Sequence, residues 1–369
     1  MPDPRIEKLA DLLVNYSVKI KPGEKVAVEG SSLAEPLIYA LYTQILRAGG
    51  HPYVLVDLPG LKELFYKNAS DEQLQYIHEP MKYVVEHYDV SISIMADANT
   101  RAMSGIDPAK MVTASRARRD LFDTYMRRSA SGELRWTVTL FPTHAHAQDA
   151  DMSLSEYEDF VYNACMVDMQ DPVGYWQGVY DRQEKIIEWL KGKNQVHITA
   201  PGTDLRLSIA GRTFINCACT VNVPDGEVFT GPVEDSVEGH VSFTYPAIYG
   251  GREVTGVELW FEKGKVVNAC ATKNEDFLIQ TLDTDEGSRF VGEFAIGTNE
   301  GITRFTREIL FDKKIGGSFH MAVGSGYPET GSLNRSSVHW DMICDLRNGG
   351  EIRVDGELLY QNGKFVLNH

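Results

Sequence analysis

The chain has 369 residues, 43% of them hydrophobic and 24% charged, which is typical of globular proteins and long enough for two domains. No basic cluster offsets its formal net charge of −16, and this argues against nucleic acid or an anionic membrane as a partner. No stretch approaches the roughly eighteen uninterrupted apolar residues of a membrane-spanning helix, so no membrane partner is expected.

The cysteines and the opening residues bear on the cellular compartment. The five cysteines are scattered and form no CxxC pair, so neither a disulfide framework nor a cysteine-based zinc site is predicted. The opening residues, Met1-Pro2-Asp3-Pro4-Arg5, lack the apolar segment of a secretory signal. The expected location is therefore the reducing cytoplasm.

The first half of the chain alternates helix and strand patterns. Apolar residues at helical spacing predict helices over residues 6–16, 33–48, 70–78, 107–128, 153–166 and 178–192. Short β-rich runs predict strands over residues 25–28, 53–56, 90–94 and 136–140. This alternation predicts an α/β domain with a parallel sheet and flanking helices. No GxGxxG motif or Walker loop occurs, so nucleotide binding is not predicted.

After Gly192 the pattern changes to short strands joined by glycine-rich turns. The predicted strands cover residues 196–199, 205–209, 215–223, 240–244, 254–262, 265–271, 318–323 and 351–354. Helical patterns are few and cover residues 273–282 and 299–310. We therefore expect an α/β domain over 1–192 and a mainly β (α+β) second domain over 193–369.

Candidate metal ligands gather in this second half. In the segment Val338-His339-Trp340-Asp341, the imidazole of His339 and the carboxylate of Asp341 stand two residues apart and would point to the same face of a strand. Upstream lie His320, Glu293 and Glu227, each beside glycine or in a short apolar run. Two imidazoles and three carboxylates are suitable ligands for one or two divalent cations, which would support metal-assisted hydrolysis.

Each of these residues also has a purely structural explanation. A single histidine in an apolar segment is more often a hydrogen-bonded core residue than a ligand, and single carboxylates beside glycine are common in turns. The combination favours a metal site, because charged groups between apolar neighbours are costly to bury unless they are paired or metal-bound. The residues alone leave both interpretations open. A second pair with the same spacing, His144 and His146, is followed by Asp149 and Asp151, and we expect it in an exposed loop.

Four segments of the second half resemble the aminopeptidase T (thermophilic aminopeptidase, aminopeptidase S) family of metallopeptidases. They are residues 221–229, 292–299, 320–324 and 334–341. Residues 140–143 and 152–157 of the first half also look familial, so the resemblance spans almost the whole chain.

The resemblance implies two co-catalytic divalent ions, which are zinc, cobalt, manganese or magnesium in the family, and a homodimer acting on peptides with a free N-terminus. The implied metal ligands are Glu227, Glu293, His320, His339 and Asp341. In this scheme Asp341 bridges the ions, Glu293 or Glu227 acts as general base, and Tyr327 donates to the tetrahedral oxyanion.

One departure from the family pattern bears on the metal centre. Many members carry an acidic residue directly after the aspartate that precedes the histidine segment, whereas here Lys313 follows Asp312. Two alternatives therefore stay open. A related scaffold serves ring-cleaving dioxygenases of dihydroxypyridines, in which His320, His339 and Asp341 would hold one iron. In the second alternative, Lys313 near the site marks a non-catalytic relative, which keeps the fold but binds peptides or a partner without turnover.

Overall fold

The structure is a computed structural model in which residues 3–366 are described, and it divides into two compact units. The first unit comprises the residues up to Val173 together with Cys219–Pro224. The second comprises Gly174–Ala218 and the residues from Asp225 onward. The division falls within helix α10 (Pro172–Leu190), whereas the domain boundary after residue 192 stays a prediction from the sequence pattern. No helix in the described part of the chain is both long and apolar enough to cross a membrane.

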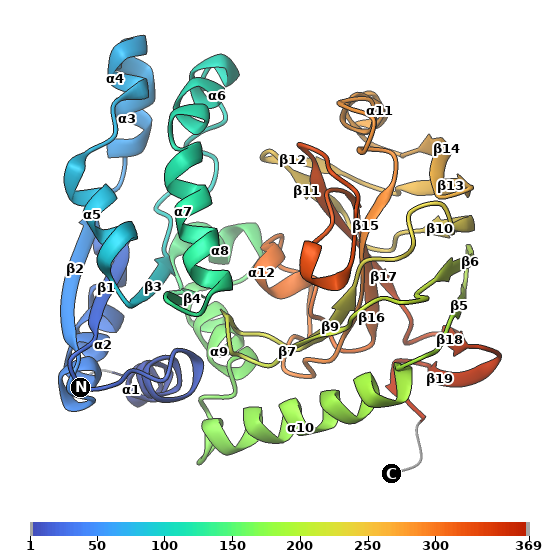
Figure 1. Cartoon of the computed structure of the whole chain (residues 1–369), viewed down its shortest axis with the longest axis horizontal. Helices are drawn as coiled ribbons and strands as arrows, with labels where there is room; N and C mark the ends of the chain where they lie inside the picture. Colours follow the sequence, from blue (N-terminus) through green and yellow to red (C-terminus); the bar gives the residue numbers. More distant parts are fainter. Residues whose placement is uncertain (1–2, 367–369) are drawn as a thin grey trace. The chain divides into compact units, whose positions relative to one another are not determined.

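A five-stranded parallel sheet forms the centre of the first unit. Its strands run in the order β2 (His51–Asp57), β1 (Lys25–Ser31), β3 (Val90–Met95), β4 (Arg135–Leu140) and β8 (Asn222–Val223), and every neighbouring pair is parallel. Branched residues such as Val26, Val28 and Ile92 are fully buried in these strands, as expected for a sheet covered by helices. Figure 1 shows helices flanking this sheet, which confirms the predicted α/β class.

Helices account for most of the remaining first unit. They are α1 (Pro4–Asp11), α2 (Glu35–Arg47), α3 (Leu61–Asn68), α4 (Asp71–Gln75), α5 (Glu79–His87), α6 (Pro108–Ala117), α7 (Arg119–Ala130), α8 (His144–Asp149) and α9 (Leu154–Ala164). Ser70 caps α4 through a capping box with Gln73. The helix predicted over 70–78 ends at Gln75, and the next helix, α5, begins at Glu79 with Pro80 in its first turn, where proline is well tolerated. The single helix predicted over 107–128 is instead two helices that meet at Arg118, where no proline or glycine marks the break.

The second unit is mainly β, as predicted, and contains two larger antiparallel sheets and a hairpin. The eight-stranded sheet has the order β14 (Lys265–Cys270), β13 (Glu258–Glu262), β10 (Glu238–Ser242), β6 (Thr203–Ser208), β5 (Gln195–Ala200), β18 (Glu351–Val354), β19 (Glu357–Gln361) and β20 (Lys364–Phe365). The five-stranded sheet has the order β17 (His339–Asp345), β16 (Ser318–Gly324), β15 (Val291–Gly297), β9 (Glu227–Thr230) and β7 (Ile215–Cys217). The hairpin pairs β11 (Ala247–Tyr249) with β12 (Arg252–Val254), and α11 (Glu275–Leu282) follows β14.

Three predictions for this half are wrong in detail. The strand predicted over 254–262 is interrupted, since Val254 ends β12 and β13 begins only at Glu258. The strand predicted over 215–223 is split, since β7 joins the five-stranded sheet of the second unit and β8 joins the parallel sheet of the first. The helix predicted over 299–310 is reduced to α12 (Ile309–Asp312). The Asn299 side chain accepts a hydrogen bond from the Gly301 N–H, and such a side chain-to-backbone turn competes with helix formation.

The two larger sheets of the second unit contribute to one hydrophobic core. On the five-stranded sheet, Phe294, Phe319, Met321, Trp340 and Met342 are almost completely buried in this core. Trp340 packs against aromatic rings of the hairpin and of α11, with centroid distances of 5.3 Å to Tyr249 and 5.9 Å to Phe277. Burial of such large aromatic side chains fixes which face of the sheet points inward.

Candidate metal centre

The opposite face of the five-stranded sheet collects all five predicted ligands. Because side chains alternate along a strand, His339 and Asp341 share this face of β17 while Trp340 points into the core. Asp341 lies opposite Ala322, and Ala322 lies opposite Glu293 on β15, so the two carboxylates belong to one row across the sheet. The remaining two predicted ligands, His320 on β16 and Glu227 on β9, lie on the same face of the sheet.

Small residues leave room between these side chains. Ala295, Gly297, Ala322 and Gly324 occupy positions of the same face, between or beside the predicted ligands. A larger side chain at these positions would fill the space into which the imidazoles and carboxylates project. The alternation of small residues with ligands on one face, and of large apolar residues on the other, is therefore the local sequence basis of the site.

The turn before β9 sets the position of Glu227. Gly226 has φ of +119°, a conformation that a residue with a Cβ rarely adopts, and a Cβ there would lie 2.9 Å from the Cβ of Asn299. The Gly226 carbonyl accepts a hydrogen bond of 2.8 Å from the Thr298 N–H at the end of β15. This close approach seats the first residue of β9 beside β15.

His320 connects the carboxylates of three strands. Its Nε2 atom lies 3.0 Å from Glu293 Oε1, 3.6 Å from Glu227 Oε2 and 3.9 Å from Asp341 Oδ1. The His320 and Glu293 side chains are completely buried, and that of Glu227 is almost so. Burial of two carboxylates around one imidazole is costly unless cations compensate the negative charge.

His339 approaches the same carboxylates from β17. Its Nε2 atom lies 3.2 Å from Glu293 Oε2 and 3.7 Å from Asp341 Oδ1, while its Nδ1 atom lies 2.7 Å from the carbonyl oxygen of Ser325. The carbonyl orients the ring, as is common for histidines that bind metals through the other nitrogen. Burial alone would lower the pKa of His339, but its contacts with Glu293 and Asp341 raise the pKa to about 9.

The donor atoms fit a divalent ion. Within the described residues, several buried atoms of these side chains have no hydrogen-bond partner: Glu227 Oε2, Glu293 Oε2, His339 Nε2 and Asp341 Oδ1. Protein ligands bind zinc at about 2.0–2.2 Å, so two ligands of one ion lie at most about 4.4 Å apart. The imidazole-to-carboxylate separations of 3.2–3.7 Å satisfy that limit. Two donor groups result, Glu227–Glu293–His320 and Glu293–His339–Asp341, and they share Glu293.

Lys313, which directly follows α12, contacts this cluster. Its ammonium lies 3.2 Å from Glu227 Oε1 and 3.4 Å from Glu293 Oε1, and its side chain is only 14% exposed. Burial alone would lower the pKa of Lys313, but Glu227, Glu293 and Asp341 raise it well above its ordinary value. Burial likewise opposes ionisation of Glu293, yet Lys313 and the two histidines hold the pKa of that carboxyl well below its usual range. An ammonium therefore belongs to the charge balance of the site.

A second lysine, which sequence reasoning missed, is buried next to the site. Lys314 is completely buried and its Nζ lies 3.4 Å from Oδ1 of the buried Asp225. Burial raises the pKa of Asp225 to about 6 even beside Lys314. Adjacent lysines are ordinarily exposed, and the one signal in the sequence is that this pair lies between the apolar residues Phe311 and Ile315.

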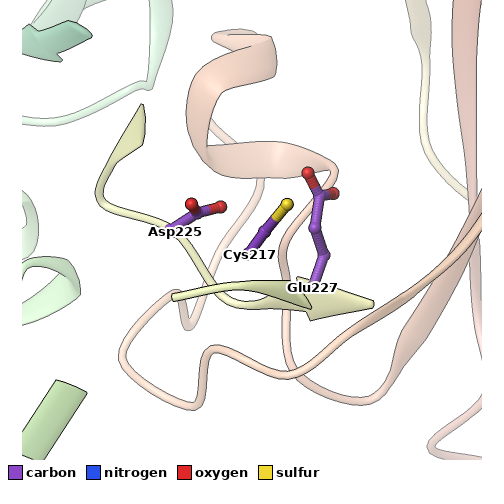
Figure 2. A group of neighbouring side chains, drawn as sticks. All are labelled: Cys217, Asp225 and Glu227. Atoms are coloured by element: carbon purple, nitrogen blue, oxygen red, sulfur yellow. The ribbon is translucent and has the colours of Figure 1, made fainter. Parts of the chain in front are cut away.

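Cys217 lies between Asp225 and Glu227, as Figure 2 shows, and pairs in register with Glu227. One donor atom from each of these three residues lies within 4.8 Å of the others. Burial and the two carboxylates raise the pKa of the Cys217 thiol well above its ordinary value, so the sulfur carries its proton. Glu227 also belongs to the donor group with Glu293 and His320, so Cys217 and Asp225 lie directly beside the predicted metal ligands.

Tyr327 lies beside the histidine of β17. Its ring packs edge-on against His339 with a centroid distance of 5.3 Å, and it is 37% exposed. Burial and the nearby Glu293 raise the pKa of Tyr327, so its hydroxyl stays protonated and available as a donor at neutral pH.

The rival histidine pair is not in an exposed loop, and that prediction is corrected. His144 and His146 lie in helix α8, where residues two apart do not share a face. His146 is buried, and its Nδ1 atom lies 2.9 Å from the Oγ1 atom of Thr143, the N-cap residue of this helix. It has the structural role that a buried histidine most often has.

The donor set on this sheet face is compatible with a divalent metal ion. The sequence profile described as "Thermophilic metalloprotease (M29)" matches residues 2–365 of this chain. The chain belongs to that family, which makes it a hydrolase that depends on a divalent metal.

Known proteins are similar over nearly the full length. Aminopeptidase 2 of Geobacillus stearothermophilus is 26% identical over 391 residues, which cover 95% of this chain and 93% of that protein. The structure of wild-type AmpT from Thermus thermophilus has a TM-score of 0.86 at 24% identity and covers 99% of both chains. That of a 2,5-dihydroxypyridine dioxygenase from Pseudomonas putida KT2440 has a TM-score of 0.58 at 13% identity, with 98% and 97% of the chains covered. At these identities the structural likenesses establish the fold alone.

Proposed function

We propose that this protein is a metal-dependent aminopeptidase that removes residues from the free N-terminus of peptides. The observation that carries this proposal is the convergence of three carboxylates and two imidazoles on one sheet face, with buried donor atoms that lack hydrogen-bond partners among the described residues. The names of the relatives, including aminopeptidase 2, give the reaction class.

The metal would be held by Glu293, His339 and Asp341, with His320 and Glu227 beside them. A bound divalent ion polarises a carbonyl oxygen and lowers the pKa of a water from about 15.7 to about 7. The two-ion arrangement implied by the family resemblance needs a further cation among Glu227, Glu293 and His320, where Lys313 already makes contact. The identity and number of ions and the homodimer stay predictions.

The protein's own groups would complete the reaction. Glu293 is ionised at neutral pH and would accept a proton from the attacking water. Tyr327 keeps its proton and would donate a hydrogen bond to the oxyanion that develops on the peptide carbonyl. A spare carboxylate oxygen of Asp341, which is partly exposed, would attract the charged α-amine of the peptide. This attraction would restrict hydrolysis to the N-terminal residue.

The test uses chelator-stripped protein, to which Zn²⁺, Co²⁺, Mn²⁺ or Mg²⁺ is returned singly. Aminoacyl 4-nitroanilides should be cleaved in the presence of at least one ion, whereas the matched N-acetylated substrates should not. Glu293→Gln should abolish turnover and Glu262→Gln, at an exposed position of β13, should not. Absence of turnover with every ion, in protein whose folding is verified by circular dichroism, would refute the proposal.

The same preparation also tests the dioxygenase alternative. Oxygen uptake with Fe²⁺ and a dihydroxypyridine, without hydrolysis of any anilide, would assign the protein to that class instead. Metal-free protein that binds peptides without cleaving them would support the non-catalytic alternative.

A further inference from the structure

We infer that the Lys313 ammonium takes the place of one cation, so that the centre binds a single divalent ion through Glu293, His339 and Asp341. The inference rests on the proposed metal centre but does not depend on which reaction that centre catalyses.

The contacts divide the site into two halves that share Glu293. On one side, Glu227, Glu293 and His320 form a donor group, and the Lys313 ammonium touches Oε1 of both glutamates. On the other side, the second oxygen of Glu293 faces His339 at 3.2 Å, and Asp341 Oδ1 lies 3.7 Å from the same imidazole nitrogen. The ammonium therefore lies against the first group, whereas His339 and Asp341 belong to the second.

The backbone on either side of Lys313 is held by buried contacts. Before it, Asp312 Oδ1 accepts hydrogen bonds of 2.7 and 2.9 Å from the N–H and hydroxyl of Thr306. After it, the Lys314 carbonyl accepts a hydrogen bond of 3.1 Å from the Asn299 N–H, and its ammonium lies 3.4 Å from Asp225. With both neighbours anchored, the Lys313 side chain is directed at the carboxylates instead of being a mobile surface lysine.

The balance of formal charges also favours a single divalent ion. The three carboxylates of Glu227, Glu293 and Asp341 carry three negative charges, and Lys313 with one divalent ion supplies three positive ones. The nearby Asp225 and Lys314 form their own neutral pair. A second divalent ion would leave the buried cluster with two excess positive charges, and it would lie within a few ångströms of an ammonium. Such an arrangement is strongly repulsive in a poorly solvated site.

The experiment counts ions. Chelator-stripped protein is equilibrated by dialysis against saturating Mn²⁺, and the bound metal is measured by elemental analysis and by electron paramagnetic resonance. Wild-type protein should bind one ion per chain and give the six-line signal of an isolated Mn²⁺. Lys313→Glu replaces the ammonium by a carboxylate and should bind two ions whose spins couple. Lys265→Glu, which makes the same charge change at an exposed position of β14, should still bind one.

Two ions per wild-type chain would overturn the inference, and this measurement does not need any variant to fold. A folded Lys313→Glu variant that still binds one ion would also overturn it, and folded wild-type protein without any bound ion would refute the metal centre itself. One ion in the wild type and two in the variant, without peptide hydrolysis, would leave the inference standing while the proposed function fails. Hydrolysis by a wild-type protein with two ions would leave the proposed function standing while the inference fails.

Discussion

Tyr327 illustrates how a single side chain in the site can be tested apart from metal binding. Its ring lies edge-on to His339, and its phenol keeps its proton at neutral pH because burial and Glu293 raise its pKa. Tyr327→Phe keeps the ring contact and removes the donor. We expect kcat for an aminoacyl anilide to fall about 10²–10³-fold, the usual effect of losing one oxyanion donor. Metal stoichiometry should not change, and loss of bound metal in this variant would point to a structural role instead.

Asp312 gives a pH-dependent contribution to stability. It is completely buried, and burial raises the pKa of its carboxyl to about 8 although it accepts two hydrogen bonds from Thr306. Because this pKa lies above the unfolded value of about 3.9, the folded protein holds the extra proton. The resulting stabilisation is complete below about pH 4 and is lost as the pH rises through 8.

Asp312→Asn keeps an oxygen acceptor but cannot ionise, so it should remove this dependence. Between pH 5 and 8 the free energy of unfolding of the wild type should fall by on the order of 2–4 kcal/mol more than that of the variant. Thermal melts of both proteins across this range measure the difference. Asp276→Asn, at an exposed position of α11, serves as the control, and parallel pH profiles for wild type and Asp312→Asn would contradict the assignment.

At the scale of elements, the five-stranded sheet separates a core face from a ligand face by strict alternation. The placement of His339 and Asp341 on one face of a strand could be predicted from their spacing, and β17 has that alternation. Strand β15 was not predicted, because glycines at two of its seven positions weaken the strand pattern of its sequence. Which strands lie next to one another depends on long-range pairing that local sequence does not encode.

A backbone bulge at Gly292 supports the histidine of β17. The register of β15 against β16 shifts between Val291 and Glu293, and a Cβ at Gly292 would lie 2.3 Å from the Gly324 oxygen and 2.4 Å from the Ser325 oxygen. The Ser325 carbonyl is the group that orients His339. Gly292 is therefore coupled to the metal centre through backbone alone.

Gly292→Ala should displace that backbone. We expect a loss of about 1–3 kcal/mol of stability from overpacking, together with a 10–100-fold loss of metal affinity from the disturbed histidine partner. Thermal melts and competition with a fluorescent chelator measure the two effects. Gly105→Ala, where no atom lies within 4 Å of the added Cβ, should change neither. Unchanged metal affinity in folded Gly292→Ala would show that the Ser325 contact does not position His339.

At the scale of the whole molecule, the buried carboxylates link metal binding to folding. A ligand that binds only the folded state at 100 times its dissociation constant adds about 2.7 kcal/mol of stability. The melting temperature of chelator-stripped protein should therefore rise when a binding metal is added and fall again when chelator is returned. Glu293→Gln should lose this response and Glu262→Gln should keep it. An equal rise in all three proteins would show that the ion binds elsewhere.

The amino-acid sequence alone determined the classes of the two halves and predicted five candidate metal ligands, because periodicity and residue chemistry are local properties. The sequence predicted Glu227, Glu293, His320, His339 and Asp341 together, and in the structure each lies within 3.9 Å of another of the five. The burial of Lys313 and Lys314 was decided only by tertiary structure. Two adjacent lysines have the same local pattern whether they face water or carboxylates. Their burial depends on α12 placing them against Asp225, Glu227 and Glu293, which come from distant parts of the chain.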